Sequence, residues 1–148
     1  MRGVPGDAPF RPLDHTADVG LVIRGRTESE LFANAAAGLA DLMIDRAAVR
    51  ERTVEEIAID LPGSPLDELL REFLSEILFR FHARKRVAAR AEIVSLAPGA
   101  IRARLHGEEY DRARHGGKIE VKGVTFHRLA LERKAPAGPL EATVVFDV

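Results

Sequence analysis

The sequence predicts an α+β fold, with two helices packed on a mixed, largely antiparallel sheet in a two-layer single domain. Two segments have the apolar spacing and the start signals of amphipathic helices. Predicted strands outnumber these helices, and the later strands follow one another without a helix between them, which is typical of α+β proteins. With 148 residues and 46% hydrophobic content, the chain is long enough for one domain with a core and too short for two ordinary ones.

The first predicted elements are a strand and a capped helix. Residues 1–12 contain three prolines and two glycines, which suits a flexible lead-in or an edge segment, so we expect the folded domain at 13–148. The apolar run within 19–26 predicts a strand. Thr27 and Glu30 match a capping box, in which the threonine caps the amide three residues on and the glutamate reaches back. The helix that follows has one apolar face, formed by Leu31, Ala35, Leu39, Leu42 and Met43.

A second strand and a second helix come next, after a polar connection at 45–52. Apolar residues alternate with polar ones along 53–61, as expected for a strand with one face in water. Pro62 and Gly63 end it. Ser64 as the cap and Pro65 at the first helical position predict the start of a long helix. Its apolar stripe consists of Leu66, Leu69, Leu70, Phe73, Leu74, Ile77 and Phe81.

The second half of the chain reads mainly as β structure. Strands are predicted at 87–96, 101–105, 119–127 and 140–148. The first two form a hairpin, because proline and glycine lie in the turn at 97–100. A polar loop is expected at 106–117. Gly123 interrupts its strand, which indicates a bulge or a close backbone approach.

Composition excludes several kinds of chemistry. The chain has no cysteine, so disulfides, thiolate zinc sites and cysteine nucleophiles are excluded. No apolar stretch approaches the roughly 20 residues of a spanning helix, and the first residues lack a signal-peptide core, so we expect a soluble, cytoplasmic protein without membrane contact. The sequence also lacks a glycine-rich phosphate loop, a GxSxG elbow and an HExxH motif.

Charge is divided unevenly along the chain. Residues 1–76 hold 8 basic and 15 acidic side chains, whereas 77–148 hold 14 and 8. The basic segment Arg80–Arg86 follows the second helix, where cations suit the negative end of the helix dipole. The helix dipole is by itself a sufficient explanation for these cations. Nucleic-acid binding would also need exposed aromatic residues among the cations, and the nearby candidates are Phe81 and Tyr110.

The candidate site consists of two short segments with acidic side chains, one before the first predicted strand and one at the end of the last. Asp14, His15 and Asp18 precede the first strand and offer oxygen and nitrogen donors for a divalent metal; turn capping by the acids is the alternative. Asp147 lies at the end of the last strand, next to the α-carboxylate of Val148. If the last strand pairs near the first, Asp18 and Asp147 would converge on one cation. An exposed, fraying terminus explains Asp147 equally well.

Two further residues are weaker candidates. Lys122 could supply a point charge to a phosphate or to the carboxylates, although a solvated strand lysine is the commoner outcome. His127 is a lone histidine and a weak ligand candidate. The sequence shows no nucleophile with an adjacent base, which favours binding over covalent catalysis.

Taken together, these motifs resemble the archease family from about residue 13 to residue 148. The resemblance rests on residues 14–20 (DHTADVG), 27–32, 69–78, 121–127 and the acidic ending 147–148. Ser75, Gly123 and Phe126 depart from the family pattern, in which asparagine, alanine and tyrosine are usual. The acidic and lysine positions are intact.

This resemblance implies a protein cofactor of the RtcB-type tRNA-splicing RNA ligase and not an enzyme. Such a cofactor promotes the GTP-dependent guanylylation of the ligase and its repeated turnover, and meets tRNA or other RNA through the ligase. The resemblance assigns metal binding to Asp18 and Asp147, with Val148 beside them, and the functional lysine to Lys122. Asp14, His15 and His127 are possible neighbours. The metal would be calcium, manganese, magnesium or zinc. A metal-dependent phosphohydrolase and a stand-alone RNA-binding module remain the alternatives.

Overall fold

The computed structural model describes residues 8–13, 18–125, 130–133 and 135–148. In chain order the elements are β1 (Phe10–Leu13), β2 (Val19–Gly25), α1 (Glu28–Met43), the 3-10 turn η1 (Arg46–Ala48), β3 (Thr53–Asp60), α2 (Leu66–Arg84), β4 (Arg86–Ala97), β5 (Ala100–Glu109), α3 (Arg112–His115), β6 (Gly123–Val124), β7 (Ala130–Arg133) and β8 (Leu140–Asp147). The predicted α+β class is confirmed.

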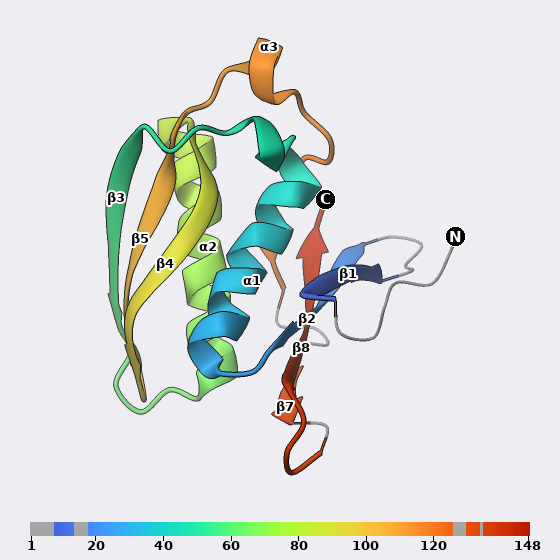
Figure 1. Cartoon of the computed structure of the whole chain (residues 1–148), viewed down its shortest axis with the longest axis vertical. Helices are drawn as coiled ribbons and strands as arrows, with labels where there is room; N and C mark the ends of the chain where they lie inside the picture. The colour runs from blue at the N-terminus through green and yellow to red at the C-terminus, as the bar shows by residue number, and fades with distance from the viewer. Residues whose placement is uncertain (1–7, 14–17, 126–129, 134) are drawn as a thin grey trace.

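The strands form two antiparallel sheets, where the sequence predicted one. The larger sheet has the order β1-β2-β8-β6, with β7 also paired to β8, and the smaller has the order β3-β5-β4. Helices α1 and α2 lie between the two sheets (Figure 1). Helix α1 contacts β2 on one side and β4 on the other. The arrangement therefore has three layers and not the predicted two, because each sheet has one face covered by the helices.

Helix α1 begins as the sequence predicts. Thr27 is the N-cap, and its hydroxyl oxygen accepts the Glu30 amide hydrogen at 3.1 Å. The Glu30 carboxylate reaches back to the Arg26 amide at 2.8 Å, one residue before the cap. This reciprocal capping satisfies amides that have no partner inside the helix.

Small residues let α1 fit between the sheets. Gly38 faces β1 and β2 so closely that a Cβ atom there would lie 2.9 Å from Leu21 Cδ1 and 3.1 Å from Phe10 Cγ. Ala36 and Ala40 are also buried. Because both sides of the helix are covered, buried residues spread around α1 beyond the single stripe expected from the sequence.

Helix α2 carries the central aromatic contact of the core. Phe73 is fully buried, and its ring centroid lies 5.7 Å from that of Phe32 on α1. Of the predicted stripe, Leu66 and Phe81 are only half-buried, and the other five members are buried. The N-cap is Pro65, which makes no side-chain cap bond, so the predicted cap at Ser64 is wrong by one residue.

The remaining sequence predictions hold in part. The hairpin of β4 and β5 is confirmed, with Gly99 in its turn at φ +74°. Residues 106–109 continue β5 and 112–115 form α3, so the predicted loop at 106–117 is wrong. Of the strand predicted at 119–127, only β6 is present in the described part, and residues 126–129 lie outside it. Strand β1 includes the last residues of the predicted lead-in.

A buried polar cluster joins the segment after η1 to β5 and α3. Glu108 is 3% exposed and His115 is completely buried. Glu108 Oε2 accepts hydrogen bonds from the Arg50 amide at 2.9 Å, from His115 Nε2 at 2.7 Å and from Arg114 at 3.2 Å. Nδ1 of His115 accepts the Asp111 amide hydrogen, so Nε2 carries the ring hydrogen. A buried carboxylate needs such compensation to remain ionised.

We expect Phe73→Ala to lower the free energy of unfolding by about 3–5 kcal/mol, because the truncation leaves a cavity in a close-packed core. Urea unfolding followed by circular dichroism measures it. Phe79→Ala on the same helix is the matched control: Phe79 is 52% exposed, so its truncation should cost less than about 1 kcal/mol. Equal losses for the two variants would contradict this packing.

We also expect acid to weaken the fold through Glu108. The Arg50 amide, then His115 and Arg114, hold the pKa of this carboxyl below its ordinary value of 4.5. The pKa of Glu108 is lower in the folded protein than in the unfolded chain. This stabilisation is therefore fully present above pH 4.5 and is lost as pH falls through the pKa of the folded state. Glu108→Gln should be less stable at neutral pH and lose less stability on acidification, as followed by urea unfolding across pH. Glu109→Gln, at the exposed neighbour, should retain the wild-type acid dependence.

Candidate functional site

The ends of β2 and β8 bring two aspartates to the same edge of the larger sheet. These strands are antiparallel neighbours, and Val19 pairs with Phe146. Asp18 immediately precedes Val19, and Asp147 immediately follows Phe146. Asp18 is half-buried and Asp147 is exposed, as is Val148 at 43%. The pairing on which the sequence argument depended is therefore present.

Lys122 joins this edge through the backbone of Asp147. The Lys122 amide donates a hydrogen bond to the Asp147 carbonyl oxygen at 2.7 Å, and the lysine is exposed. The next residue, Gly123, pairs with Asp147 in the register of β6 and β8. A Cβ atom on Gly123 would lie 3.8 Å from Asp147 Oδ2, so the carboxylate lies against this glycine. An alanine would fit there in ordinary van der Waals contact.

The segment that leads from α3 into β6 is held by the C-terminal end of α1. The Lys118 amide donates to the Met43 carbonyl at 2.8 Å, and the Ile119 amide donates to the Leu42 carbonyl at 3.1 Å. The last carbonyls of a helix have no partner within it, so they are available for such bonds. Val121 is completely buried in the core. The backbone position of Lys122 is thus determined by α1 and β8 together.

His82 contributes a contact to this segment that the sequence did not reveal. It lies in the last turn of α2, and its Nε2 atom is 2.7 Å from the Val121 carbonyl oxygen. Since a carbonyl can only accept, Nε2 donates the hydrogen. In the sequence His82 is one member of the basic segment Arg80–Arg86, whose composition indicated only helix-end charge. The C-terminal ends of both helices therefore hold the segment before Lys122, with α1 bonded to Lys118 and Ile119 and α2 bonded to Val121.

The other predicted site residues are not placed. Asp14, His15 and His127 lie outside the described residues. Within the described part, no group of three or more His, Cys, Asp and Glu side chains is arranged to hold a metal ion. The described residues supply two carboxylates, main-chain oxygens and one ammonium group. This chemistry suits a hard cation or a phosphate group, because such ligands prefer oxygen donors and positive charge respectively.

The fold and this strand-end cluster define a class of small α+β proteins in which two antiparallel sheets enclose two helices. The Archease protein family model matches residues 10–148. "Protein archease" of Methanosarcina mazei is 33% identical over 143 residues, covering 94% of this chain and 95% of the relative. "Protein archease" of Pyrobaculum islandicum is 38% identical over 136 residues, covering 88% and 89%. The chain belongs to the archease family.

A solved structure agrees with this assignment. The solution structure of Methanobacterium thermoautotrophicum Protein 1598 is similar with a TM-score of 0.70 and 26% identity, over 95% of this chain and 99% of that one. At the level of the family, membership supports an accessory role with an RNA ligase. No helix in the described part of the chain is long and apolar enough to cross a membrane.

Proposed function

We propose that this chain activates an RtcB-type RNA ligase in tRNA splicing or RNA repair by promoting its GTP-dependent guanylylation and its multiple turnover. The observation that carries the proposal is the meeting of Asp18, Asp147 and Lys122 at one edge of the larger sheet. Archease membership supports an RNA ligase as the partner. In this role the chain is an accessory protein, and the ligase performs the covalent chemistry.

A divalent metal fits the donors at this edge. Asp18, Asp147 and a main-chain oxygen of Val148 would hold it, since carboxylate and main-chain oxygens are the ligands that calcium, magnesium and manganese prefer. Zinc also accepts carboxylate oxygen, usually together with nitrogen ligands. Bound there, the metal would supply positive charge that can neutralise triphosphate oxygens. Exposure of Asp147 leaves that face open to the ligase.

Lys122 would act beside the metal as a second positive charge. Its backbone is anchored to Asp147, and the segment before it is bonded to both helices, whereas its side chain is exposed. Anchoring the backbone reduces the conformational freedom that an exposed lysine must lose on binding. The ammonium group could then offset charge on the GTP phosphates or orient the Asp147 carboxylate.

Metal binding is tested on the isolated protein. Asp147→Ala should weaken binding of Mn²⁺ or Ca²⁺ in isothermal titration calorimetry by about tenfold or more, because one anionic oxygen donor is removed. Asp60→Ala is the matched control. Asp60 is an exposed aspartate at the end of β3, where it pairs with Arg102 on the smaller sheet. Affinity that is unchanged in Asp147→Ala would remove this residue from the site.

Ligase activation is tested with Lys122→Ala at limiting amounts of this protein. The melting temperature should stay near that of the wild type, because an exposed lysine adds little stability, while formation of ligase-bound GMP should fall about tenfold or more. Lys118→Ala, an exposed lysine in the same segment, controls for general loss of charge. Full stimulation by folded Lys122→Ala would eliminate the role of the lysine. Metal-dependent phosphate release by this protein without ligase would favour a phosphohydrolase instead.

A further inference from the structure

Three basic segments that are far apart in the sequence meet at the end of the molecule that carries α3 (Figure 1). They are residues 50–52, 84–86 and 112–114, and together they form what we call the basic end. Backbone hydrogen bonds attach the first two segments to β5 and the residue after it: Arg52 donates to Gly107 at 2.9 Å, and Tyr110 donates to the Lys85 carbonyl at 2.6 Å. The third segment is α3 itself, which follows directly.

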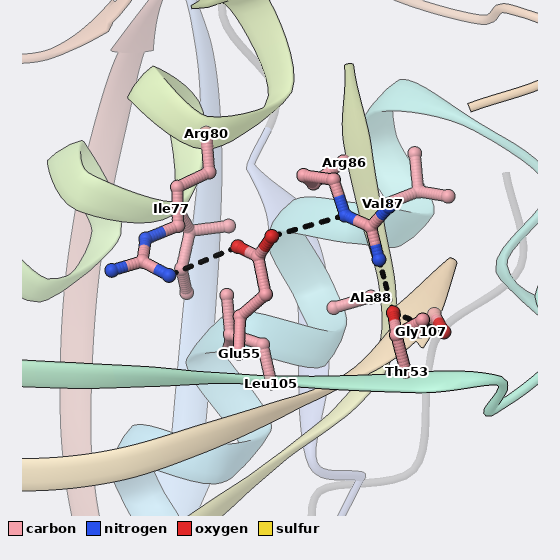
Figure 2. Close-up of a pocket in the computed structure, with 9 residues that line it drawn as sticks. All are labelled: Thr53, Glu55, Ile77, Arg80, Arg86, Val87, Ala88, Leu105 and Gly107. Carbon is pink, nitrogen blue, oxygen red and sulfur yellow. Dashed lines mark hydrogen bonds and ion pairs between the residues drawn. The ribbon is translucent and has the colours of Figure 1, made fainter. Parts of the chain in front are cut away.

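The acids at the basic end are largely turned inward or already bound. The Glu108 side chain is 4% exposed, whereas its ion-pair partners Arg52 and Arg114 are 62% and 30% exposed. Figure 2 shows Glu55 between Arg80 and Arg86, at 2.9 and 3.1 Å.

Two other acids are also engaged, because Asp111 caps the Ala113 amide and Glu51 binds Arg90. Glu109 is exposed and lowers the net charge. The outward-facing charge nevertheless remains predominantly positive, since each of the three segments presents exposed arginine or lysine.

These cations converge on a hollow. Its charged lining consists of four arginines and three acids, namely Arg52, Arg86, Arg112, Arg114, Glu108, Glu109 and Asp111. Thr53 and Tyr110 line it as well, although the Tyr110 hydroxyl is already bonded to the Gly116 carbonyl. Guanidinium groups that approach one space from different elements suit a phosphate, whose oxygens accept hydrogen bonds in several directions.

An exposed aromatic ring lies beside Arg84, one cation of the basic end. Phe79 on α2 is 52% exposed, and the Arg84 guanidinium carbon is 5.8 Å from its ring centroid. The aromatic candidates from the sequence do not serve this purpose, because Phe81 and Tyr110 are half-buried and pack edge to face, with centroids 5.2 Å apart. Phe79 therefore supplies the exposed aromatic that nucleic-acid binding requires, at a position the sequence did not indicate.

We propose that the basic end binds single-stranded RNA, with the arginines on its phosphates and Phe79 stacking on a base. The exposed ring favours RNA over an acidic protein surface, because a base has a flat face to stack on and a carboxylate does not. This inference goes beyond the proposed function. It concerns a different end of the chain from Lys122 and needs no ligase, so either can fail without the other.

The experiment is fluorescence anisotropy of a short labelled single-stranded RNA with the full chain alone, at several salt concentrations. Arg52→Ala/Arg112→Ala should weaken binding at least tenfold and reduce the slope of log affinity against log salt by about 1.4, which corresponds to two phosphate contacts. The matched control is Arg102→Ala/Arg104→Ala, on the outer face of the smaller sheet, where both arginines pair with acids. It should bind as the wild type does.

The stacking contact is tested separately. Phe79→Ala should weaken RNA binding roughly 5- to 150-fold at every salt concentration with little change in slope, and Phe79→Trp should restore it, because base stacking on an aromatic ring is sequence-tolerant and uncharged. Thermal melts establish that each variant is folded.

Three outcomes would overturn the proposal. The wild type could show no salt-dependent RNA affinity, or the control pair could weaken binding as much as the basic-end pair. Alternatively, the basic-end variants could keep their RNA affinity and lose affinity for the ligase in calorimetry without RNA. In that last case the basic end would contact an acidic protein surface.

Discussion

The burial of α1 between two sheets is the constraint on which the rest of the structure depends. The two sheets lie on opposite sides of one layer of helices, so each sheet needs the helices to cover its inner face. The helix in that layer must be narrow, which explains why Gly38 approaches Leu21 and Phe10 without room for a Cβ atom. Interiors are close-packed, so a larger residue there would separate the sheets or distort the helix.

The same layer places the candidate site. Because α1 and α2 end on the same side, near the end of β8, their terminal groups are available to the chain that passes there. The α1 carbonyls of Leu42 and Met43 accept its amides, and His82 at the end of α2 binds the Val121 carbonyl. An irregular segment thereby becomes a fixed support for Lys122. The buried Glu108 cluster acts similarly at the basic end, where it holds Arg50 and α3 to β5.

Local patterns predicted most helices and strands but not the irregular regions. The capping box at Thr27 and the stripe around Phe73 are consequences of short-range spacing, and both are present. Helix α3 was missed because its four residues carry no apolar period, and its stability comes from His115 bonded to a glutamate seven residues earlier. Both faces of β2 are buried in the middle of the strand, which accounts for its uninterrupted apolar run.

The sequence by itself determined the α+β class, the archease resemblance and the identity of the candidate residues, because composition, periodicity and motif are local properties of the chain. Only the tertiary structure decided that Asp18 and Asp147 share one edge of a sheet, and that His82 supports the segment before Lys122. The tertiary structure also decided which charges face outward, because it places Arg52 and Arg112 close to the buried Glu108. The physical reason is that strand pairing and ion pairing join residues many positions apart, and neither leaves a periodic signal in the sequence.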